Sequence, residues 1–193
     1  MTILWGAVNR PKQTQEISGD TYVVKEFAPD GLMVAVIDGL GGGEEAARAA
    51  LGAAEIVQNH PDYPLEDIIR RAHSALHNTR GAVIALLRLN LKEHKASYIG
   101  VGNIGIYVQS AQPIKPISKN GILGYRLPPA LLQLHYPYNS GDTFVLYSDG
   151  ISSRFALDGK IDPSLAPQAV AESILANYGK TIDDATVVVV RDD

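Results

Sequence analysis

The sequence contains no cysteine, no long hydrophobic run and no cluster of basic residues. With no Cys among its 193 residues, it can form no disulfide, thiol nucleophile or thiolate zinc site. No apolar run approaches the roughly 20 residues that a membrane-spanning helix needs. The N-terminal segment MTILWGAVNRP lacks a charged region followed by a long apolar stretch, so no signal peptide is expected. These absences predict a cytoplasmic protein with no membrane partner.

The charged residues are spread along the chain, with a slight excess of acids. There are 17 Lys and Arg residues against 21 Asp and Glu residues, which gives a formal net charge of −4. The densest basic pair, Arg70-Arg71, falls on a predicted helix, where solvated charge is the simplest interpretation. No nucleic-acid partner is therefore expected. The length and a hydrophobic content of 46% favour one globular domain over residues 1–193.

Hydrophobic periodicity predicts blocks of strands with helices inserted between them. Helices are expected over residues 44–60, 65–79 and 164–178, and the Gly- and Pro-rich residues 119–130 are expected to form a surface loop. Strands are expected over residues 2–9, 20–27, 31–38, 82–90, 96–101, 104–109, 113–118, 131–136, 143–148 and 185–191. Because strands are grouped and do not alternate with helices, the pattern favours an α+β fold over a doubly wound α/β sheet.

Acidic residues stand at the ends of three strongly apolar strands. The run LMVAVIDG ends in Asp38-Gly39, TFVLYSDG ends in Asp149-Gly150, and Asp183-Asp184 precedes the run ATVVVV. A carboxylate at the end of a core strand is costly unless a positive charge neutralises it. A glycine after such an acid allows a sharp turn or a close approach. The three positions, far apart in sequence, therefore predict one shared cation.

The ligand types indicate which cation and which reaction. Asp38, Asp149 and Asp183 offer hard oxygen ligands, which select Mg²⁺ or Mn²⁺ over zinc. Asp20, in the segment ISGD, is a fourth acid beside a glycine. So few protein ligands would leave several waters bound, and two ions would balance the charge. A water that bridges two metals is a strong nucleophile near neutral pH, and a phosphate ester is its natural target.

Simpler interpretations exist for each of these features. An Asp-Gly pair after a strand is often only a turn, and Asp183-Asp184 could be a solvated loop. His73 and His77 are spaced to share a metal on a helix, but HSALH lacks the glutamate of the HExxH pattern, so surface or packing roles are favoured.

Two glycine-rich segments resemble nucleotide-binding motifs. GVGNIG, residues 100–105, satisfies GxGxxG but is followed by a strand, so two strands meeting at a tight turn are predicted. DGLGGGEEA leads into a helix and could hold an anion, but it lacks the Lys-Ser/Thr of a P-loop.

An ordered set of motifs resembles the metal-dependent PPM (type-2C) protein phosphatases. In chain order the segments are ISGD, AVIDGLGGG, RGAVIALL, GVGNIGIYV, LYSDGIS and DDATVVVV, which span about residues 16 to 191. Within this family the chain most resembles the small single-domain stressosome phosphatases of the RsbX type. The resemblance implies a β-sandwich of two antiparallel sheets flanked by helices, in four αββα layers, with a two-metal centre at one edge.

The resemblance also implies roles for individual residues. Asp38 would bridge two Mn²⁺ or Mg²⁺ ions, the Gly39 carbonyl would bind one of them, and Asp149 and Asp183 would bind the other. Asp20 would hold a metal-bound water. Catalysis would thus depend on Asp38 and Asp149, acting through the metal-bound water. The full set of implied metal ligands is Asp20, Asp38, Gly39, Asp149 and Asp183, with Asp184 as the alternative to its neighbour.

The implied substrates are phosphoserine and phosphothreonine on STAS-domain proteins of the stressosome, whose dephosphorylation would reset the stress response. Two departures from the family pattern bear on catalysis. Leu40 stands where many members have a histidine that protonates the leaving group, so a metal-bound water would be the acid or catalysis would be slower. Asn103 replaces an acid that can hold a third metal, so two ions are expected. These losses leave open a pseudophosphatase that only binds phosphorylated partners. An unrelated metal phosphohydrolase acting on small substrates is a third alternative, which requires that activity toward phosphopeptides be absent.

Overall fold

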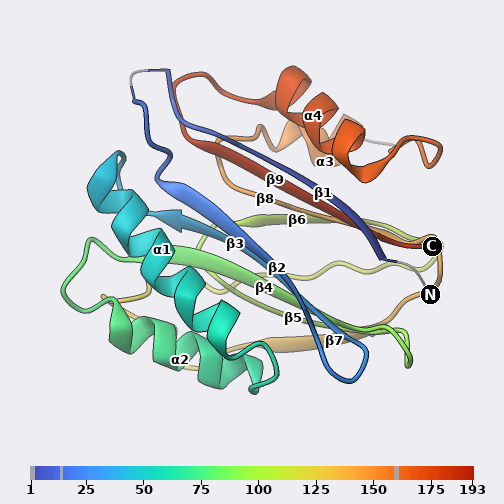
Figure 1. The fold of residues 1–193 in the computed structure, drawn as a ribbon, viewed down its shortest axis with the longest axis horizontal. Helices are drawn as coiled ribbons and strands as arrows, with labels where there is room; N and C mark the ends of the chain where they lie inside the picture. Colours follow the sequence, from blue (N-terminus) through green and yellow to red (C-terminus); the bar gives the residue numbers. More distant parts are fainter. Residues whose placement is uncertain (1–2, 14, 159–160) are drawn as a thin grey trace.

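Two stacked antiparallel sheets with helices on both outer faces make up the computed structural model (Figure 1). The structure describes residues 3–13, 15–158 and 161–193. The predicted α+β sandwich is therefore confirmed, with helix, sheet, sheet and helix as its four layers. Among the described residues, no helix has the length and apolar character needed to cross a membrane.

The strand order within each sheet is non-sequential. One sheet has the order β1 (Ile3–Arg10), β9 (Ala185–Asp192), β8 (Thr143–Tyr147) and β6 (Gly105–Gln109). The other has the order β2 (Asp20–Phe27), β3 (Gly31–Gly39), β4 (Ala82–Asn90), β5 (Lys95–Val101) and β7 (Gln133–Pro137). Helices α1 (Glu44–Asn59) and α2 (Leu65–Ala75) cover the second sheet, and α3 (Arg154–Asp158) and α4 (Pro167–Tyr178) cover the first (Figure 1).

The strands β3 and β9 are apolar without alternation because both of their faces are buried. In β3, alternate residues pack against α1 and α2 on one side and against the opposite sheet on the other, namely Met33, Ala35 and Ile37 versus Leu32, Val34 and Val36. In β9, Val187 and Val189 pack toward α4, while Val188 and Val190 lie between the sheets. Burial on both faces contributes strongly to the stability of these strands.

Small residues allow helices to lie close to the sheets. Helix α1 has a face of small residues, including Ala46, Ala50 and Ala53, that is fully buried. A Cβ on Gly39 would lie 2.0 Å from the carbonyl oxygen of Ala46, so only glycine fits under this helix. The glycine after Asp38 is thus explained by a close approach of helix backbone and not by a sharp turn.

Several predicted elements differ in the structure. Residues 113–118 do not form a strand, because Pro113 and Pro116 lack the N–H groups that a ladder requires. The helix predicted to continue to residue 79 ends at Ala75, and the short α3 was not predicted. GVGNIG does join two strands, but β5 and β6 belong to different sheets, so the segment crosses between layers.

Substituting Gly6 with alanine should loosen the contact between β1 and α4. The added Cβ would lie 2.2 Å from the Gln168 nitrogen, at a point where the Gln168 side chain also bonds the Ala7 backbone at 3.0 and 3.2 Å. We expect the free energy of unfolding, measured by urea denaturation, to fall by about 1–3 kcal/mol. Gly52→Ala is the matched control, because its nearest atom is the flexible end of Leu76 at 3.1 Å and alanine favours the helix. Equal stability of Gly6→Ala and the parent would contradict this packing.

Candidate metal centre

Asp20 and Asp38 meet where β2 begins and β3 ends. The β2–β3 register pairs Asp20 directly with Asp38, and the Gly39 N–H donates to the Gly19 carbonyl at 3.0 Å just beyond the pair. Directly opposed carboxylates on neighbouring strands repel one another. The ladder therefore imposes an unfavourable pairing at this edge of the sandwich.

The other acids reach the same edge from the opposite sheet. After β8 ends, the Ser148 N–H donates to the Thr186 carbonyl at 3.0 Å, and the Thr186 N–H donates to Ser148 Oγ at 2.9 Å. These bonds hold Asp149 beside Asp183 and Asp184. A Cβ on Gly150 would lie 1.9 Å from the Asp184 carbonyl oxygen, so glycine is again required by a close backbone approach.

Three of the five acids line an open pocket of about 310 Å³. Asp38, Asp149 and Asp183 form its acidic wall, and the remaining lining residues are Leu40, Gly41, Val83, Asn103 and Ile122. We call this space the acid pocket. Asp20 and Asp184 lie behind the wall with 5% and 4% of their surface exposed. Gly39 does not line the pocket, although it adjoins Asp38.

The adjacent residues Asp183 and Asp184 have different surroundings. Asp183 is half-buried and faces the acid pocket. Asp184 is buried and accepts a hydrogen bond from the Lys12 N–H at 2.9 Å, which ties the segment after β1 to the start of β9. Asp183 Oδ1 accepts only the N–H of the adjacent Asp184, at 3.0 Å, whereas Asp184 is bonded to a segment far away in the sequence.

The electrostatics of this edge are strongly unfavourable. Burial raises the pKa of Asp38 to about 8, with further contributions from the negative charges of Asp20, Asp149, Asp183 and Asp184. No Lys or Arg in the described segments forms an ion pair with any of these five acids. An added cation is the physical remedy for such a cluster.

Asp20 provides a direct test of whether a cation fits. Both carboxylate oxygens are buried and have no hydrogen-bond partner in the described structure. Burial raises the Asp20 pKa to about 6, although the nearby hydroxyls of Ser148 and Thr186 lower it in part. An unsatisfied buried polar group costs about 1–3 kcal/mol and a charged one costs more, and a bound ion or its water would recover this cost.

The ligand set fits a hard divalent cation that keeps water ligands. The acid pocket offers only oxygen donors, which suit Mg²⁺ or Mn²⁺. Within residues 3–13, 15–158 and 161–193, no three acidic or histidine side chains form a set that could hold an ion by themselves. Ions here would thus be bound by few carboxylates each, with water completing the shell, as is usual for Mg²⁺.

Asn103 and two lysines contact the acids in ways that the sequence did not reveal. Asn103 Nδ2 donates to Asp149 Oδ2 at 2.8 Å, and Lys180 Nζ donates to the Asp149 carbonyl at 2.6 Å. Lys12, already described, is 172 positions from its partner Asp184. Contacts at such sequence separations leave no local signal, so only the folded structure identifies them.

The alternative sites considered from sequence have structural roles. His73 and His77 contact each other edge to face, with ring centroids 4.9 Å apart. Their Nδ1 atoms lie 3.0 and 3.2 Å from the backbone N–H and carbonyl of Gly124. The packing role favoured for this pair therefore agrees with the structure.

Comparison with known proteins places the chain among phosphatases. The family described as Stage II sporulation protein E (SpoIIE) matches residues 28–192. Phosphoserine phosphatase RsbX of Bacillus subtilis (strain 168) is 29% identical over 144 residues, which cover 73% of this chain and 71% of the relative.

Solved structures give the same result. A chain from a structural study of the bacterial stressosome, as a modular system adapted to control secondary messenger signalling, is 33% identical with a TM-score of 0.91. That match covers 99% of this chain and 100% of the other. RsbX in complex with magnesium is 24% identical with a TM-score of 0.84, and the match covers 98% and 94% of the two chains. The latter similarity establishes the fold.

The stability of the metal-free protein should fall as pH rises. The Asp38 pKa is raised to about 8, so between about pH 4 and pH 8 the unfolded state has lost a proton that the folded state retains. Raising the pH therefore favours unfolding. Asp38→Asn cannot ionise, and in EDTA at about pH 8 we expect it to be about 1–3 kcal/mol more stable than the parent.

The measurement is urea unfolding in EDTA at acidic and mildly alkaline pH. The difference in unfolding free energy between Asp38→Asn and the parent should shrink toward the acidic end, where the Asp38 carboxyl of the parent is protonated in both the folded and the unfolded state. Asp193→Asn, at the exposed C-terminus, is the matched control and should show no such pH dependence. A pH-independent difference for Asp38→Asn would contradict the electrostatic account.

Proposed function

Because this chain belongs to the SpoIIE family of PP2C-type phosphatases, we propose that its acid pocket hydrolyses phosphoserine and phosphothreonine in stressosome proteins. The chain is a protein serine/threonine phosphatase similar to RsbX. The single observation that carries the proposed mechanism is the convergence of five uncompensated carboxylates on one edge of the sandwich. A divalent metal is the cofactor that this arrangement implies.

The proposed metal ligands follow from position in the pocket. Among these acids Asp38 has the most strongly raised pKa, and the negative charges of all four others contribute to the rise. Asp38 is therefore the proposed bridge between two Mn²⁺ or Mg²⁺ ions. Asp149 and Asp183 complete the acidic wall and are the proposed ligands of one ion. Asp183 is preferred to Asp184 because it faces the pocket. The Gly39 carbonyl is proposed as a further ligand, and Asp20 as the acceptor for a bound water.

Bound ions would activate a water and neutralise the phosphate charge. The residues of the chain position this chemistry. Asn103 fixes one oxygen of Asp149, leaving its other oxygen available, and the Lys180 bond to the Asp149 carbonyl holds the backbone after β8. The side chain of Leu40 carries no proton to give to the leaving serine oxygen, and its partial burial against the inter-sheet core keeps that part of the wall apolar.

The proposed substrates are phosphorylated STAS-domain proteins of the stressosome, and the proposed location is the cytoplasm. The similarity to RsbX over 73% of the chain and to a chain from a stressosome study over 99% supports this choice. Removing those phosphates would reset the stress response.

A non-catalytic phosphoprotein-binding role is the second candidate. It is favoured by Leu40 and Asn103, which both line the acid pocket where the family pattern has a histidine and an acid. The retained acids oppose it, because a binding protein gains nothing from a repulsive cluster. Calorimetric titration with Mn²⁺ separates the two, since a pure binding protein requires no ion.

Hydrolysis of p-nitrophenyl phosphate should require Mn²⁺ or Mg²⁺ and stop on chelation. Asp38→Asn should lower kcat/KM by about 100-fold or more, because it weakens metal binding and transition-state charge stabilisation together. Calorimetry on the same variant should show weaker Mn²⁺ binding, and circular dichroism should show an intact fold. Asp193→Asn controls for the removal of one carboxylate. Full activity of Asp38→Asn would refute the two-ion assignment.

Leu40→His should restore a proton donor to the pocket wall. Serine is a poor leaving group that needs a proton, whereas nitrophenolate leaves without one. We therefore expect kcat on a phosphoserine peptide to rise by about ten-fold or more, with little change on p-nitrophenyl phosphate. Leu40→Gln, which is polar but transfers no proton, is the matched control. If Leu40→His and Leu40→Gln change kcat equally on both substrates, the change does not come from general-acid catalysis.

A further inference from the structure

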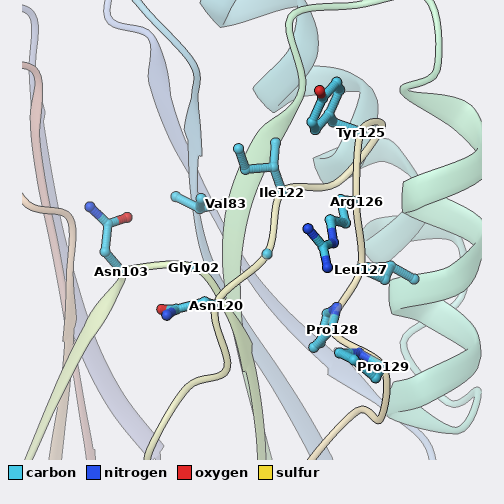
Figure 2. Close-up of a pocket in the computed structure, with 11 residues that line it drawn as sticks. Val83, Gly102, Asn103, Asn120, Ile122, Tyr125, Arg126, Leu127, Pro128 and Pro129 are labelled. Atoms are coloured by element: carbon cyan, nitrogen blue, oxygen red, sulfur yellow. The ribbon is translucent and has the colours of Figure 1, made fainter.

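A second hollow lies beside the acid pocket, and it is the larger of the two. It has a volume of about 580 Å³, compared with about 310 Å³ for the acid pocket. Figure 2 shows the chain running from Asn120 to Tyr125 and back to Pro129 along this hollow, with Val83 and Asn103 on its other side. We call this space the hairpin groove.

The hairpin groove is continuous with the acid pocket. Val83, Asn103 and Ile122 line both spaces. Asn103 also donates a hydrogen bond to Asp149, so only this one side chain separates that end of the groove from the acidic wall. A protein chain with its phosphoserine in the acid pocket would therefore extend into the groove.

The groove wall is built and held in place. Ile122 and Arg126 exchange backbone hydrogen bonds of 2.8 Å each, and Leu123 pairs with Ala82 of β4 at 2.8 and 3.2 Å. At the tip of the hairpin, Gly124 has a φ of 83°, which favours glycine. His73 of α2 and His77, which follows the helix, bond the backbone of Gly124, so the histidine pair fastens this wall.

The chemistry of the groove is the reverse of that of the acid pocket. Its lining contains no acid, and its one cation is Arg126. The Arg126 side chain is exposed, and no ion pair joins it to any carboxylate in the described parts of the chain. Beside it, Tyr125 is 81% exposed, and Ile122, Leu127 and Pro128 supply apolar surface. An exposed aromatic beside an unpaired arginine is typical of protein recognition surfaces.

We propose that the hairpin groove binds the substrate segment next to the phosphoserine, with an apolar side chain against Tyr125 and Ile122 and an acidic side chain paired with Arg126. This rests on the proposed function, since it assigns the groove to the same substrate. Arg126 is thus a specificity-determining residue that lies outside the acid pocket. There are two competing assignments. The groove could bind a second copy of this chain, or Arg126 could bind the phosphate itself.

The test uses short phosphoserine peptides in which one glutamate is moved through the positions around the phosphoserine in an otherwise alanine background. We expect at least one glutamate position to raise kcat/KM of the parent protein by about five-fold over the all-alanine peptide. Arg126→Gln should abolish this preference, Arg126→Lys should keep part of it, and Arg126→Glu should favour lysine at the same position. The ratio of peptide to p-nitrophenyl phosphate kcat/KM reports the groove separately from the reaction.

Arg70→Gln, at a site on α2 whose side chain is 60% exposed, is the matched control and should keep the preference. Absence of any glutamate preference in the parent, or its survival in Arg126→Gln, would overturn the proposal. If Arg126→Gln lowers kcat/KM equally on every substrate, p-nitrophenyl phosphate included, Arg126 binds the phosphate and not the neighbouring segment. A concentration-dependent dimer in sedimentation that Arg126→Glu dissolves would assign the groove to a second copy.

Dissociation constants of the same labelled peptides, measured by fluorescence anisotropy, keep the test independent of turnover. If hydrolysis fails on all substrates with Mn²⁺ while the glutamate preference in binding depends on Arg126, the phosphatase assignment is wrong and the groove assignment holds. If hydrolysis proceeds but the glutamate preference in binding does not depend on Arg126, the phosphatase assignment holds and the groove assignment is wrong.

Discussion

Mutual repulsion among five carboxylates is the constraint around which this structure is organised. Burial, together with the negative charges of the other four acids, raises the Asp38 pKa to about 8. Both Asp20 carboxylate oxygens are buried and have no hydrogen-bond partner in the described structure. No side chain in the described part of the chain neutralises them, so the scaffold itself must hold the acids in place. Fixed charges of one sign in a pocket are useful only if a cation or a changing charge meets them, which is the principle of preorganised electrostatic catalysis.

The scaffold can hold these acids in place because two of the strands that carry or adjoin them, β3 and β9, are deeply buried. β3 and β9 are covered on both faces, and burial of a Val or Ile side chain contributes about 1.5–3 kcal/mol. Two glycines allow the acids to be packed against this buried scaffold. Gly39 lets α1 lie against the end of β3, and Gly150 lets the segment after β8 lie against the backbone of Asp184. Hydrophobic layers thus fix the positions of groups that would otherwise move apart.

The sequence predicted the layers well and located the acids at the ends of strands, because both features leave local signals. Runs such as LMVAVIDG carry the burial of a strand and the acid at its end within a few residues, and the order of the motifs supplied the family. The strand expected at 113–118 was wrong because prolines override its apolar character. The bonds from Lys12, Lys180 and Asn103 depend on segments far apart in sequence, and no local pattern encodes such pairings.

Asn103 shows how the two halves of the site are related. An aspartate there would add a sixth carboxylate beside Asp149 and raise the repulsion further, whereas the amide donates a hydrogen bond to that acid. The same side chain lines the hairpin groove, whose lining contains no acid and whose single cation is Arg126. The lining of the acid pocket therefore contains three acids and no cation, and the lining of the groove beside it contains one cation and no acid. This separation lets substrate recognition change through the hairpin without disturbing the carboxylates.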